Sequence, residues 1–188
     1  MPTATKPLSK SVLISESCLQ KRIRELGAQI SADYENQELV LLGVLRGSVI
    51  FFADLSRAIF EAQLENASRD VQIRFEFVQL TSYHNSTQPS AVELIHGGSN
   101  YLKQRHILIV EDIVDTGQTL ETLCEHLWTL KPKTLKVCTL LNKPAKRQVP
   151  VTIDYIGFQV PDVFVVGYGL DYAQQYRNLP YIAVLEST

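Results

Sequence analysis

Nearly continuous apolar stretches alternate along the chain with stretches in which apolar residues recur at helical spacing. Three apolar runs have the length and composition of strands buried on both faces, namely residues 39–45, 106–110 and 135–141. Helical spacing is found at residues 17–33, 48–63 and 120–128. Strands that alternate with helices predict an α/β domain with a central, mainly parallel sheet flanked by helices, and a site at the carboxyl ends of the strands.

Local patterns refine this prediction. Residues 17–20 have the capping-box pattern, so the first helix is expected to begin at Ser17. At residues 71–77 apolar residues alternate with polar ones, which predicts a strand with one buried face, near an edge or in a hairpin. Short strands are expected in the tail, at residues 154–160, 164–166 and 181–185.

Residues 81–100 interrupt the alternation, because they are polar and rich in small residues. A long segment without structure inside a compact domain is either a disordered insert or a lid over an active site. Composition alone leaves both interpretations open.

Length, charge and cysteine content narrow the class of protein. The 188 residues fit one compact domain whose core needs neither disulfides nor a structural metal. The net charge of -2 gives no sequence-wide positive field, so nucleic acid is not expected as the main ligand. Three widely spaced cysteines without a C-x-x-C pair indicate reduced thiols. No signal-like or membrane-spanning apolar run occurs, which predicts a soluble cytoplasmic protein that does not bind membranes.

The candidate chemistry begins where the second apolar run ends. Glu111 and Asp112 follow this run directly, and residues 115–119 (DTGQT) form a loop of small residues that opens a helix. The unpaired N–H groups and positive dipole end of a helix N-terminus, together with the hydroxyls of Thr116 and Thr119, predict a phosphate-binding loop. Neither of the common glycine-rich nucleotide motifs occurs in the chain.

Two carboxylates beside a phosphate site need another partner. Sugar hydroxyls donate hydrogen bonds to carboxylates, and divalent cations take oxygen ligands. Glu111 and Asp112 therefore indicate a phosphorylated sugar with a free diol, or a metal ion. The alternative is structural, with these carboxylates capping the loop and Asp115 capping the helix.

Residues 110–119 (VEDIVDTGQT) resemble the phosphoribosyl-pyrophosphate motif of type I phosphoribosyltransferases. From about residue 12 onward the chain is similar to the hypoxanthine (6-oxopurine) branch of that family. Four further segments carry this likeness in family order: residues 44–48 with 51–55, Ser82-Tyr83, residues 141–143, and residues 161–172 with Tyr176-Arg177.

The resemblance implies a role for each matching residue of the sugar-phosphate motif. Glu111 and Asp112 would hold the ribose hydroxyls and, with Asp171, would be the residues that bind Mg²⁺. The 5-phosphate would be wrapped by the loop residues Asp115, Thr116, Gly117, Gln118 and Thr119. Asp115 would also be the catalytic residue, near the purine nitrogen that becomes bonded to the sugar.

The remaining motifs imply the pyrophosphate, purine and lid contacts. Arg46 and Gly47, in a strained and often cis peptide turn, would contact pyrophosphate together with Arg177. Lys143 would donate to the exocyclic oxygen of the purine. Further purine contacts would come from the Phe164 ring, stacked on the base, and the Val165 backbone. Ser82 and Tyr83 would open a flexible lid at about residues 82–100 that keeps water from the cationic sugar.

The resemblance therefore implies one phosphoribosyltransferase domain over residues 1–188, with a small hood built from the termini. The expected reaction is purine salvage, in which Mg²⁺-dependent transfer of 5-phosphoribose from phosphoribosyl pyrophosphate to hypoxanthine, and also guanine, gives IMP or GMP and pyrophosphate. The family forms dimers and tetramers, so a homodimer or homotetramer is expected.

Two alternatives stay open. One is a regulatory protein that keeps the phosphoribosyl-pyrophosphate site but lacks catalysis, and the other is transfer to xanthine. Adenine is disfavoured, because Lys143 can only donate and the exocyclic amine of adenine offers no acceptor. Gln118 departs from the family, in which lysine is common at this position, so binding of the sugar donor is expected to rely on backbone donors there.

Overall fold

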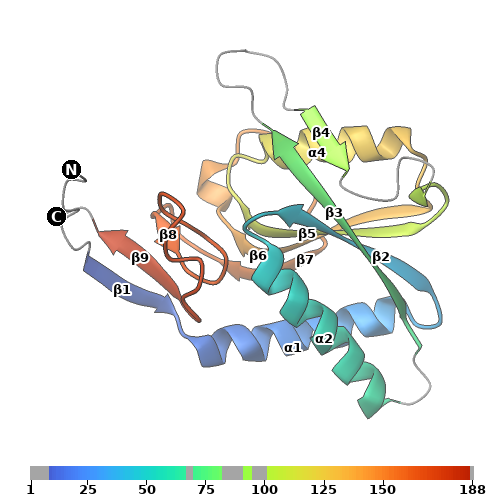
Figure 1. Cartoon of the computed structure of the whole chain (residues 1–188), viewed down its shortest axis with the longest axis horizontal. Coiled ribbons are helices and arrows are strands. Elements are labelled where there is room, and N and C mark those ends of the chain that lie inside the picture. The colour runs from blue at the N-terminus through green and yellow to red at the C-terminus, as the bar shows by residue number, and fades with distance from the viewer. Residues whose placement is uncertain (1–8, 67–69, 82–90, 95–100, 187–188) are drawn as a thin grey trace.

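The computed structural model describes residues 9–66, 70–81, 91–94 and 101–186 (Figure 1). The larger of its two sheets contains, in spatial order, β4 (Ala91–Leu94), β3 (Gln72–Thr81), β2 (Glu38–Leu45), β5 (His106–Val114), β6 (Thr134–Asn142) and β7 (Tyr155–Gln159). Five of these strands run parallel, and β4 pairs antiparallel with β3. The predicted α/β fold with a central, mainly parallel sheet is confirmed.

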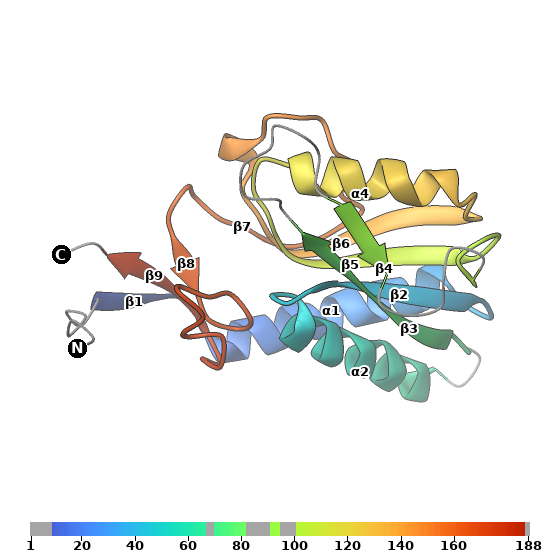
Figure 2. The same cartoon turned by 45° about the horizontal axis from the view of Figure 1, so that its top comes forward.

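Helices cover both faces of this sheet. Figure 2 shows α1 (Glu16–Asp33) and α2 (Val49–Glu65) on one face and α4 (Gln118–Thr129) on the other. Side chains of a strand alternate between the two layers, so Leu41 packs with α1 and α2 while Leu42 packs on the side of α4. This is why the central strands read as continuous apolar runs. None of the described helices is both long enough and apolar enough to cross a membrane.

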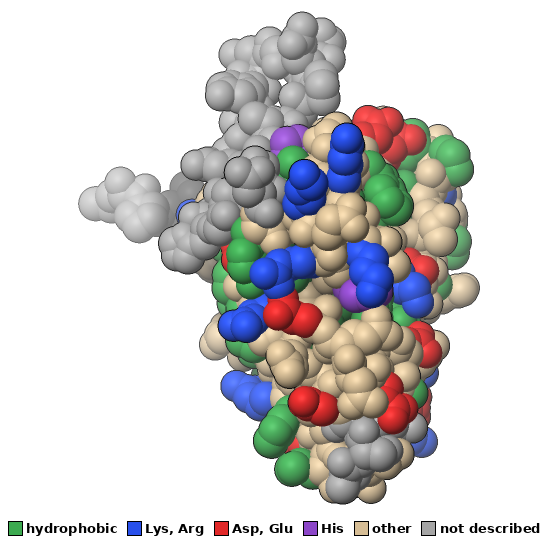
Figure 3. Space-filling model, turned by 90° about the vertical axis from the view of Figure 1, so that its right-hand side faces the viewer, with side chains coloured by type: hydrophobic (Ala, Val, Ile, Leu, Met, Phe, Trp, Pro, Cys, Tyr) green, Lys and Arg blue, Asp and Glu red, His purple; other side chains and the backbone are tan. Residues whose placement is uncertain are grey.

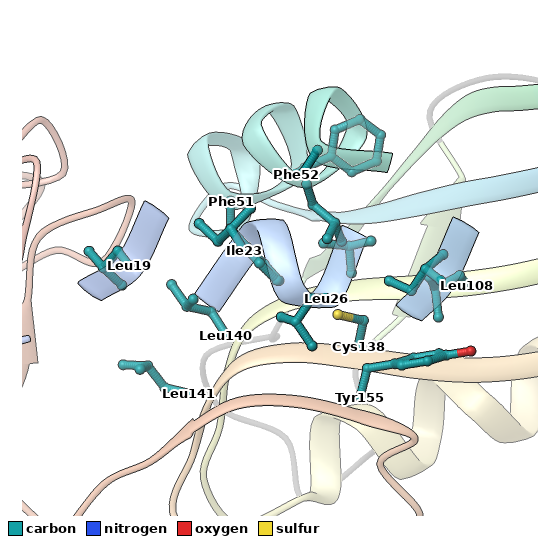
Figure 4. Packing of buried hydrophobic residues seen from close by; sticks show 14 of the residues in the cluster. Leu19, Ile23, Leu26, Phe51, Phe52, Leu108, Cys138, Leu140, Leu141 and Tyr155 are labelled. Atoms are coloured by element: carbon teal, nitrogen blue, oxygen red, sulfur yellow. The ribbon is translucent and has the colours of Figure 1, made fainter. Parts of the chain in front are cut away.

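The layer under α1 and α2 forms the larger part of the core. Figure 4 shows Ile23 of α1 beside Phe51 of α2, with Leu26 next along α1, above the sheet residues Cys138 and Leu140. The two helices touch at Gly27, where a Cβ atom would lie 2.7 Å from the Cβ of Ala58. Cys18, Cys124 and Cys138 are all free, and burial raises the pKa of the Cys138 thiol.

The second sheet is a hood beside the first. It joins β1 (Ser9–Ile14), β9 (Ile182–Glu186) and β8 (Val165–Val166) in antiparallel pairs. A hood from the two ends of the chain is implied by the resemblance, but residues 9–14 are too polar for their pattern to predict a strand. A short 3-10 helix, η1 (Pro144–Lys146), follows β6.

Two boundaries differ from the sequence-based expectation. α1 begins at Glu16, because Ser15 and not Ser17 is the N-cap, and its hydroxyl accepts the N–H of Cys18 at 3.3 Å. The expectation that residues 81–100 lack structure is wrong for β4, which pairs with the end of β3 from Val78 to Thr81. The expected lid residues Ser82 and Tyr83 lie outside the described residues.

The alternation along β3 is also wrong in detail. Phe75 was expected to be buried but is 55% exposed, whereas Glu76 is only 8% exposed. Phe75 lies near the rim of the α2 layer, where its ring contacts Phe52 edge-on at 4.8 Å and leaves its outer side uncovered. The position near the sheet edge is confirmed, since β4 is the single described strand beyond β3.

Candidate active site

The candidate residues gather at the carboxyl ends of neighbouring parallel strands. The turn at Arg46 and Gly47 follows β2, the Asp115 loop follows β5, and Lys143 follows β6. Because these strands are adjacent in the order β2, β5, β6, three loops that are distant in sequence meet at one edge of the sheet.

The first cavity of this edge, of about 320 Å³, lies over the loop that joins β5 to α4. Its lining includes Gly47, both carboxylates of β5 and the loop residues Asp115, Thr116, Gly117 and Thr119. Gly117 caps α4 with a left-handed φ of 90° and has no side chain that could cap the helix, while the Gln118 N–H donates to the Thr116 hydroxyl at 3.4 Å. The N–H groups of Thr119 and Leu120, in the same first turn of α4, remain available to an anion in the cavity.

Gln118 lies apart from the other loop residues. Its side chain does not line the cavity and instead donates to the Gln148 side chain at 3.1 Å. The Gln148 N–H in turn donates to the Thr116 carbonyl at 2.9 Å, so the segment after η1 braces the loop from outside.

A second cavity, of about 330 Å³, adjoins the first and shares Asp112, Ile113 and Asp115 with it. The candidate purine residues Lys143, Phe164 and Val165 line it, as does Asp171. Lys143 is only 5% exposed, whereas the Phe164 ring is 53% exposed and meets the Tyr172 ring edge-on at 5.7 Å. The second cavity thus combines the exposed ring of Phe164 with the buried amine of Lys143.

Glu111 and Asp112 are adjacent carboxylates on β5 that crowd each other. Burial raises the pKa of Glu111 well above its usual value, and the charge of Asp112 raises it further. Burial also raises the pKa of Asp112, although its carboxylate accepts the N–H of Ile113 at 2.7 Å. Hydroxyl donors or a divalent cation would relieve this crowding.

The turn after β2 is packed tightly against this pair. The Leu45–Arg46 peptide is cis, and a Cβ atom at Gly47 would overlap the carboxylate of Asp112. Arg46 itself is exposed and lines neither cavity, so the turn faces the first cavity through Gly47.

Arg177 and Asp171 form one unit in the hood. The Arg177 guanidinium pairs with the Asp171 carboxylate at 2.8 Å and donates to the Gly169 carbonyl at 2.7 Å. The positive charge of Arg177 also acts on Asp112, whose pKa it lowers against the effect of burial.

Asp115 faces the second cavity beside a lysine that sequence reasoning missed. The Lys146 amine lies 3.8 Å from the Asp115 carboxylate and 3.1 Å from that of Asp162. The other oxygen of Asp115 is buried and has no hydrogen-bond partner among the described residues. Lys146 lies one helical turn after Lys143, a spacing that could have indicated it.

No cluster of three or more His, Cys, Asp or Glu side chains among the described residues could by itself hold a metal ion. Asp171 is turned to Arg177, which leaves Glu111 and Asp112 as the adjacent oxygen donors. Mg²⁺ is commonly held by one or two carboxylates together with substrate phosphates and water. The donor set therefore fits Mg²⁺ when a phosphorylated substrate supplies the other ligands.

A wider hollow of about 520 Å³ lies at the amino ends of the strands, opposite the candidate site. Figure 3 shows Lys and Arg side chains around it. Among its residues, Arg105 pairs with Glu38 and also stacks on Tyr101 at 4.5 Å. Its described lining residues include neither a helix N-terminus nor a carboxylate pair, in contrast to the carboxyl ends of the strands.

Comparison with known proteins shows the family of the chain. The family model described as the phosphoribosyl transferase domain matches residues 15–173. The chain is 44% identical over 178 residues to the hypoxanthine-guanine phosphoribosyltransferase of Bacillus subtilis, covering 94% of this chain and 93% of that protein.

Solved structures are similar over the same extent. A hypoxanthine phosphoribosyltransferase from Staphylococcus aureus is 40% identical with a TM-score of 0.81, and covers 94% of this chain and 91% of its own. A variant of the Trypanosoma cruzi hypoxanthine phosphoribosyltransferase in a ternary complex with its substrates is 37% identical with a TM-score of 0.82, and covers 95% and 96%.

Proposed function

The chain belongs to the hypoxanthine-guanine phosphoribosyltransferases of the phosphoribosyl transferase family, and we propose that it is a purine-salvage enzyme acting on both bases. In this reaction the bond from the sugar to pyrophosphate breaks and a bond from the sugar to a purine nitrogen forms. Hypoxanthine gives IMP, guanine gives GMP, and pyrophosphate and the proton of the purine nitrogen are released.

One observation carries this proposal: two cavities of opposite chemistry meet at Asp112 and Asp115. The first offers helix N–H donors and hydroxyls to a phosphate, while the second offers an aromatic face and a buried amine to a planar base. A phosphorylated sugar that spans the shared wall would have its reacting carbon between the two.

The loop from Asp115 to Thr119 binds the 5-phosphate. Thr116 and Thr119 add hydroxyls to the N–H donors of the helix N-terminus, and Gly117 lets the backbone approach closely. Gln118 contributes through its backbone alone, because its side chain is occupied by Gln148.

Glu111 and Asp112 accept the ribose hydroxyls and would hold Mg²⁺. Asp171, which pairs with Arg177 at 2.8 Å in this structure, would join them on leaving that pair. When bound, the ion neutralises charge on the pyrophosphate leaving group. The raised pKa values of the two β5 carboxylates support this assignment, since both donors and cations favour their charged forms.

The purine lies in the second cavity. Its face stacks on Phe164, its edge meets the backbone of Val165, and its exocyclic oxygen accepts from Lys143. A buried amine that can only donate favours 6-oxopurines over adenine, and the same contact leaves xanthine as an alternative substrate.

Asp115 is the catalytic residue. As an aspartate it is a weak base toward a neutral purine, so it takes part of the proton and stabilises positive charge, while orientation and water exclusion supply more of the rate. Its buried oxygen without a partner supports this role. Arg46, Gly47 and Arg177 bind pyrophosphate, and Ser82 and Tyr83 belong to the lid.

The enzyme works in the cytoplasm as a homodimer or homotetramer. Support for assembly comes from an apolar face on α2 and β3, where Phe60, Leu64 and Phe75 are all more than half exposed. Apolar area of this kind is typical of surfaces that pair with another chain.

The test is product analysis with separate bases. The protein is incubated with Mg²⁺, phosphoribosyl pyrophosphate and either hypoxanthine, guanine, xanthine or adenine, and each nucleoside monophosphate is quantified. Product is expected with hypoxanthine and guanine but not adenine. Binding of phosphoribosyl pyrophosphate without product from any base would instead indicate the regulatory protein that lacks catalysis.

A further inference from the structure

Tyr168 joins the hood to both helices on one face of the sheet. Its buried hydroxyl donates to the Asp54 carboxylate on α2. Gln20 on α1 donates to the same carboxylate at 3.1 Å and lies 3.3 Å from the Tyr168 hydroxyl. Burial and then the bond to Asp54 raise the pKa of Tyr168, so the phenol keeps its proton and remains a donor. Neither Tyr168 nor Asp54 lines a cavity of the candidate site.

The residue after Tyr168 touches the turn that follows β2. A Cβ atom at Gly169 would overlap the carbonyl oxygen of Gly47. The N–H of Gly169 donates to the Arg177 carbonyl at 2.9 Å, and the Arg177 side chain donates back to the Gly169 carbonyl at 2.7 Å. Gly169 is therefore held between the two parts of the proposed pyrophosphate subsite.

The backbone of this loop needs an external anchor. Gly167, Tyr168 and Gly169 are consecutive residues with positive φ values of 101°, 50° and 102°. Glycine adopts this conformation freely, but tyrosine does so at a cost and only where its surroundings determine the conformation. The ring of Tyr168, 3% exposed and bonded to Asp54, supplies that anchor.

α2 links the two contacts, namely the hydrogen bond from Tyr168 to Asp54 and the backbone contact of Gly169 with Gly47. It begins at Val49, directly after the Gly47 turn, and carries Asp54 in its second turn. The Tyr168 side chain meets α2 while the Gly169 backbone meets the turn just before it. Two separate contacts between the same two segments fix both their distance and their relative rotation.

We propose that Asp54 and Tyr168 are positioning residues for the pyrophosphate subsite, which hold the Gly169 backbone against Gly47 and so set the spacing between that turn and Arg177. This inference rests on the proposed function. Neither residue touches the substrate, and both act through Gly169.

The proposal predicts a change in binding at the pyrophosphate subsite but not at the 5-phosphate and purine subsites. IMP has a 5-phosphate and a base but no pyrophosphate, so its affinity does not depend on the spacing of Gly47 and Arg177. Phosphoribosyl pyrophosphate and free pyrophosphate do depend on it. IMP is thus an internal reference for the rest of the site.

The test compares Tyr168→Phe with the wild-type protein in full-length form. The variant keeps the buried ring and removes only the hydroxyl. Tyr168→Phe loses the hydrogen bond to the Asp54 carboxylate, and we expect part of the lost free energy to appear as weaker binding at the pyrophosphate subsite. KM for phosphoribosyl pyrophosphate and Ki for pyrophosphate are therefore expected to rise about ten-fold. The Kd of IMP and the KM of hypoxanthine are expected to change by less than about two-fold.

Tyr155→Phe is the matched control. Tyr155 is equally buried and its hydroxyl also donates to a carboxylate, that of Asp33 at 2.6 Å, but it lies at the amino end of β7. This variant is expected to lose stability without a change in any of the four constants. Asp54→Asn, which keeps the shape and removes the charge, is expected to shift the same two constants as Tyr168→Phe by a smaller factor, and it replaces that variant if Tyr168→Phe does not fold.

Two results would overturn the proposal: unchanged constants for phosphoribosyl pyrophosphate and pyrophosphate, or an equal loss of affinity for IMP. An inactive wild-type protein would instead contradict the proposed function, which is measured first in the same assay.

Discussion

Gly47 and Asp112 lie so close together that no side chain fits between them, because a Cβ atom on Gly47 would overlap the Asp112 carboxylate. The two residues follow neighbouring parallel strands, β2 and β5. Their contact sets how closely the proposed pyrophosphate turn approaches the proposed ribose carboxylates.

Gly47→Ala tests this contact. The methyl group must displace the turn or the carboxylate, and misplacement by about 1 Å can lower the rate on the order of 100-fold, so kcat/KM for phosphoribosyl pyrophosphate is expected to fall by about that factor. Gly27→Ala is the control, since its Cβ would meet the Cβ of Ala58 at 2.7 Å far from the site. It is expected to lower Tm and leave KM unchanged. An active Gly47→Ala enzyme would show that the turn tolerates displacement.

Asp115→Asn tests the catalytic assignment. Loss of the carboxylate charge is expected to lower kcat by about 10²- to 10⁴-fold, while KM for phosphoribosyl pyrophosphate changes by only about three-fold. Asp162→Asn is a matched control, because Asp162 also pairs with Lys146, at 3.1 Å. Steady-state kinetics of both variants separate the two roles. A normal kcat in Asp115→Asn would remove Asp115 from catalysis.

Lys143→Ala tests base recognition. The buried amine is the proposed donor to the purine oxygen, and a hydrogen bond from a charged group is worth about 1.5–3 kcal/mol, so KM for hypoxanthine and guanine is expected to rise about 10- to 100-fold. Lys146→Ala, which removes the other lysine of the same cavity, is expected to affect these values less. An equal loss of affinity for phosphoribosyl pyrophosphate would point to misfolding and not to base recognition.

Glu111→Gln tests whether Glu111 and Asp112 crowd each other, through the pH dependence of the free energy of unfolding. The pKa of Glu111 is raised above 4.5 in the folded protein, so the folded state binds this proton more tightly than the unfolded state does. Relative to the glutamine variant, wild-type stability is therefore greatest below pH 4.5 and is lost as the pH rises through the folded pKa. Urea unfolding over a pH series without Mg²⁺ should show the advantage of Glu111→Gln growing with pH.

Glu25→Gln serves as the control for that series. Its hydrogen bond to Arg22 lowers the pKa of Glu25, so its pH dependence is expected to have the opposite sign. A difference between wild type and Glu111→Gln that does not vary with pH would contradict the crowding of Glu111 and Asp112.

Phe60→Glu tests the proposed assembly. A charge in the middle of the exposed apolar face of α2 and β3 is expected to convert the oligomer to monomers, as measured by sedimentation velocity. Trp128→Glu is the matched control, since this ring is 54% exposed on α4, on the other side of the sheet. Dissociation by the Trp128 variant alone would move the interface to α4.

Much of the fold could be predicted from local pattern. Strands buried between two helical layers are apolar at most positions, and this property is visible in one segment at a time. Phe75 was predicted wrongly because its burial depends on where α2 ends above the sheet. Glu76 was predicted wrongly because it lies on the opposite face, in register with Leu42, which packs on the side of α4. β1 and β4 lie at sheet edges, and their polar composition does not predict strands. Pairing with β9 and β3 stabilises them.

The site divides in the same way. Glu111, Asp112 and the loop to Thr119 are contiguous, so their residue types and spacing indicate a sugar-phosphate site. Contacts between distant segments left no such signal. Tyr168 and Asp54 are 114 residues apart, and only the folded chain brings their side chains together.

The central claim is that base and sugar phosphate react in this site, and single-turnover pyrophosphate release tests it most directly. The enzyme is mixed with Mg²⁺ and less than one equivalent of phosphoribosyl pyrophosphate, with and without hypoxanthine, and pyrophosphate and IMP are quantified together. We expect one pyrophosphate for each IMP with hypoxanthine, and very little without it. Bound phosphoribosyl pyrophosphate that releases no pyrophosphate when hypoxanthine is present would contradict the claim.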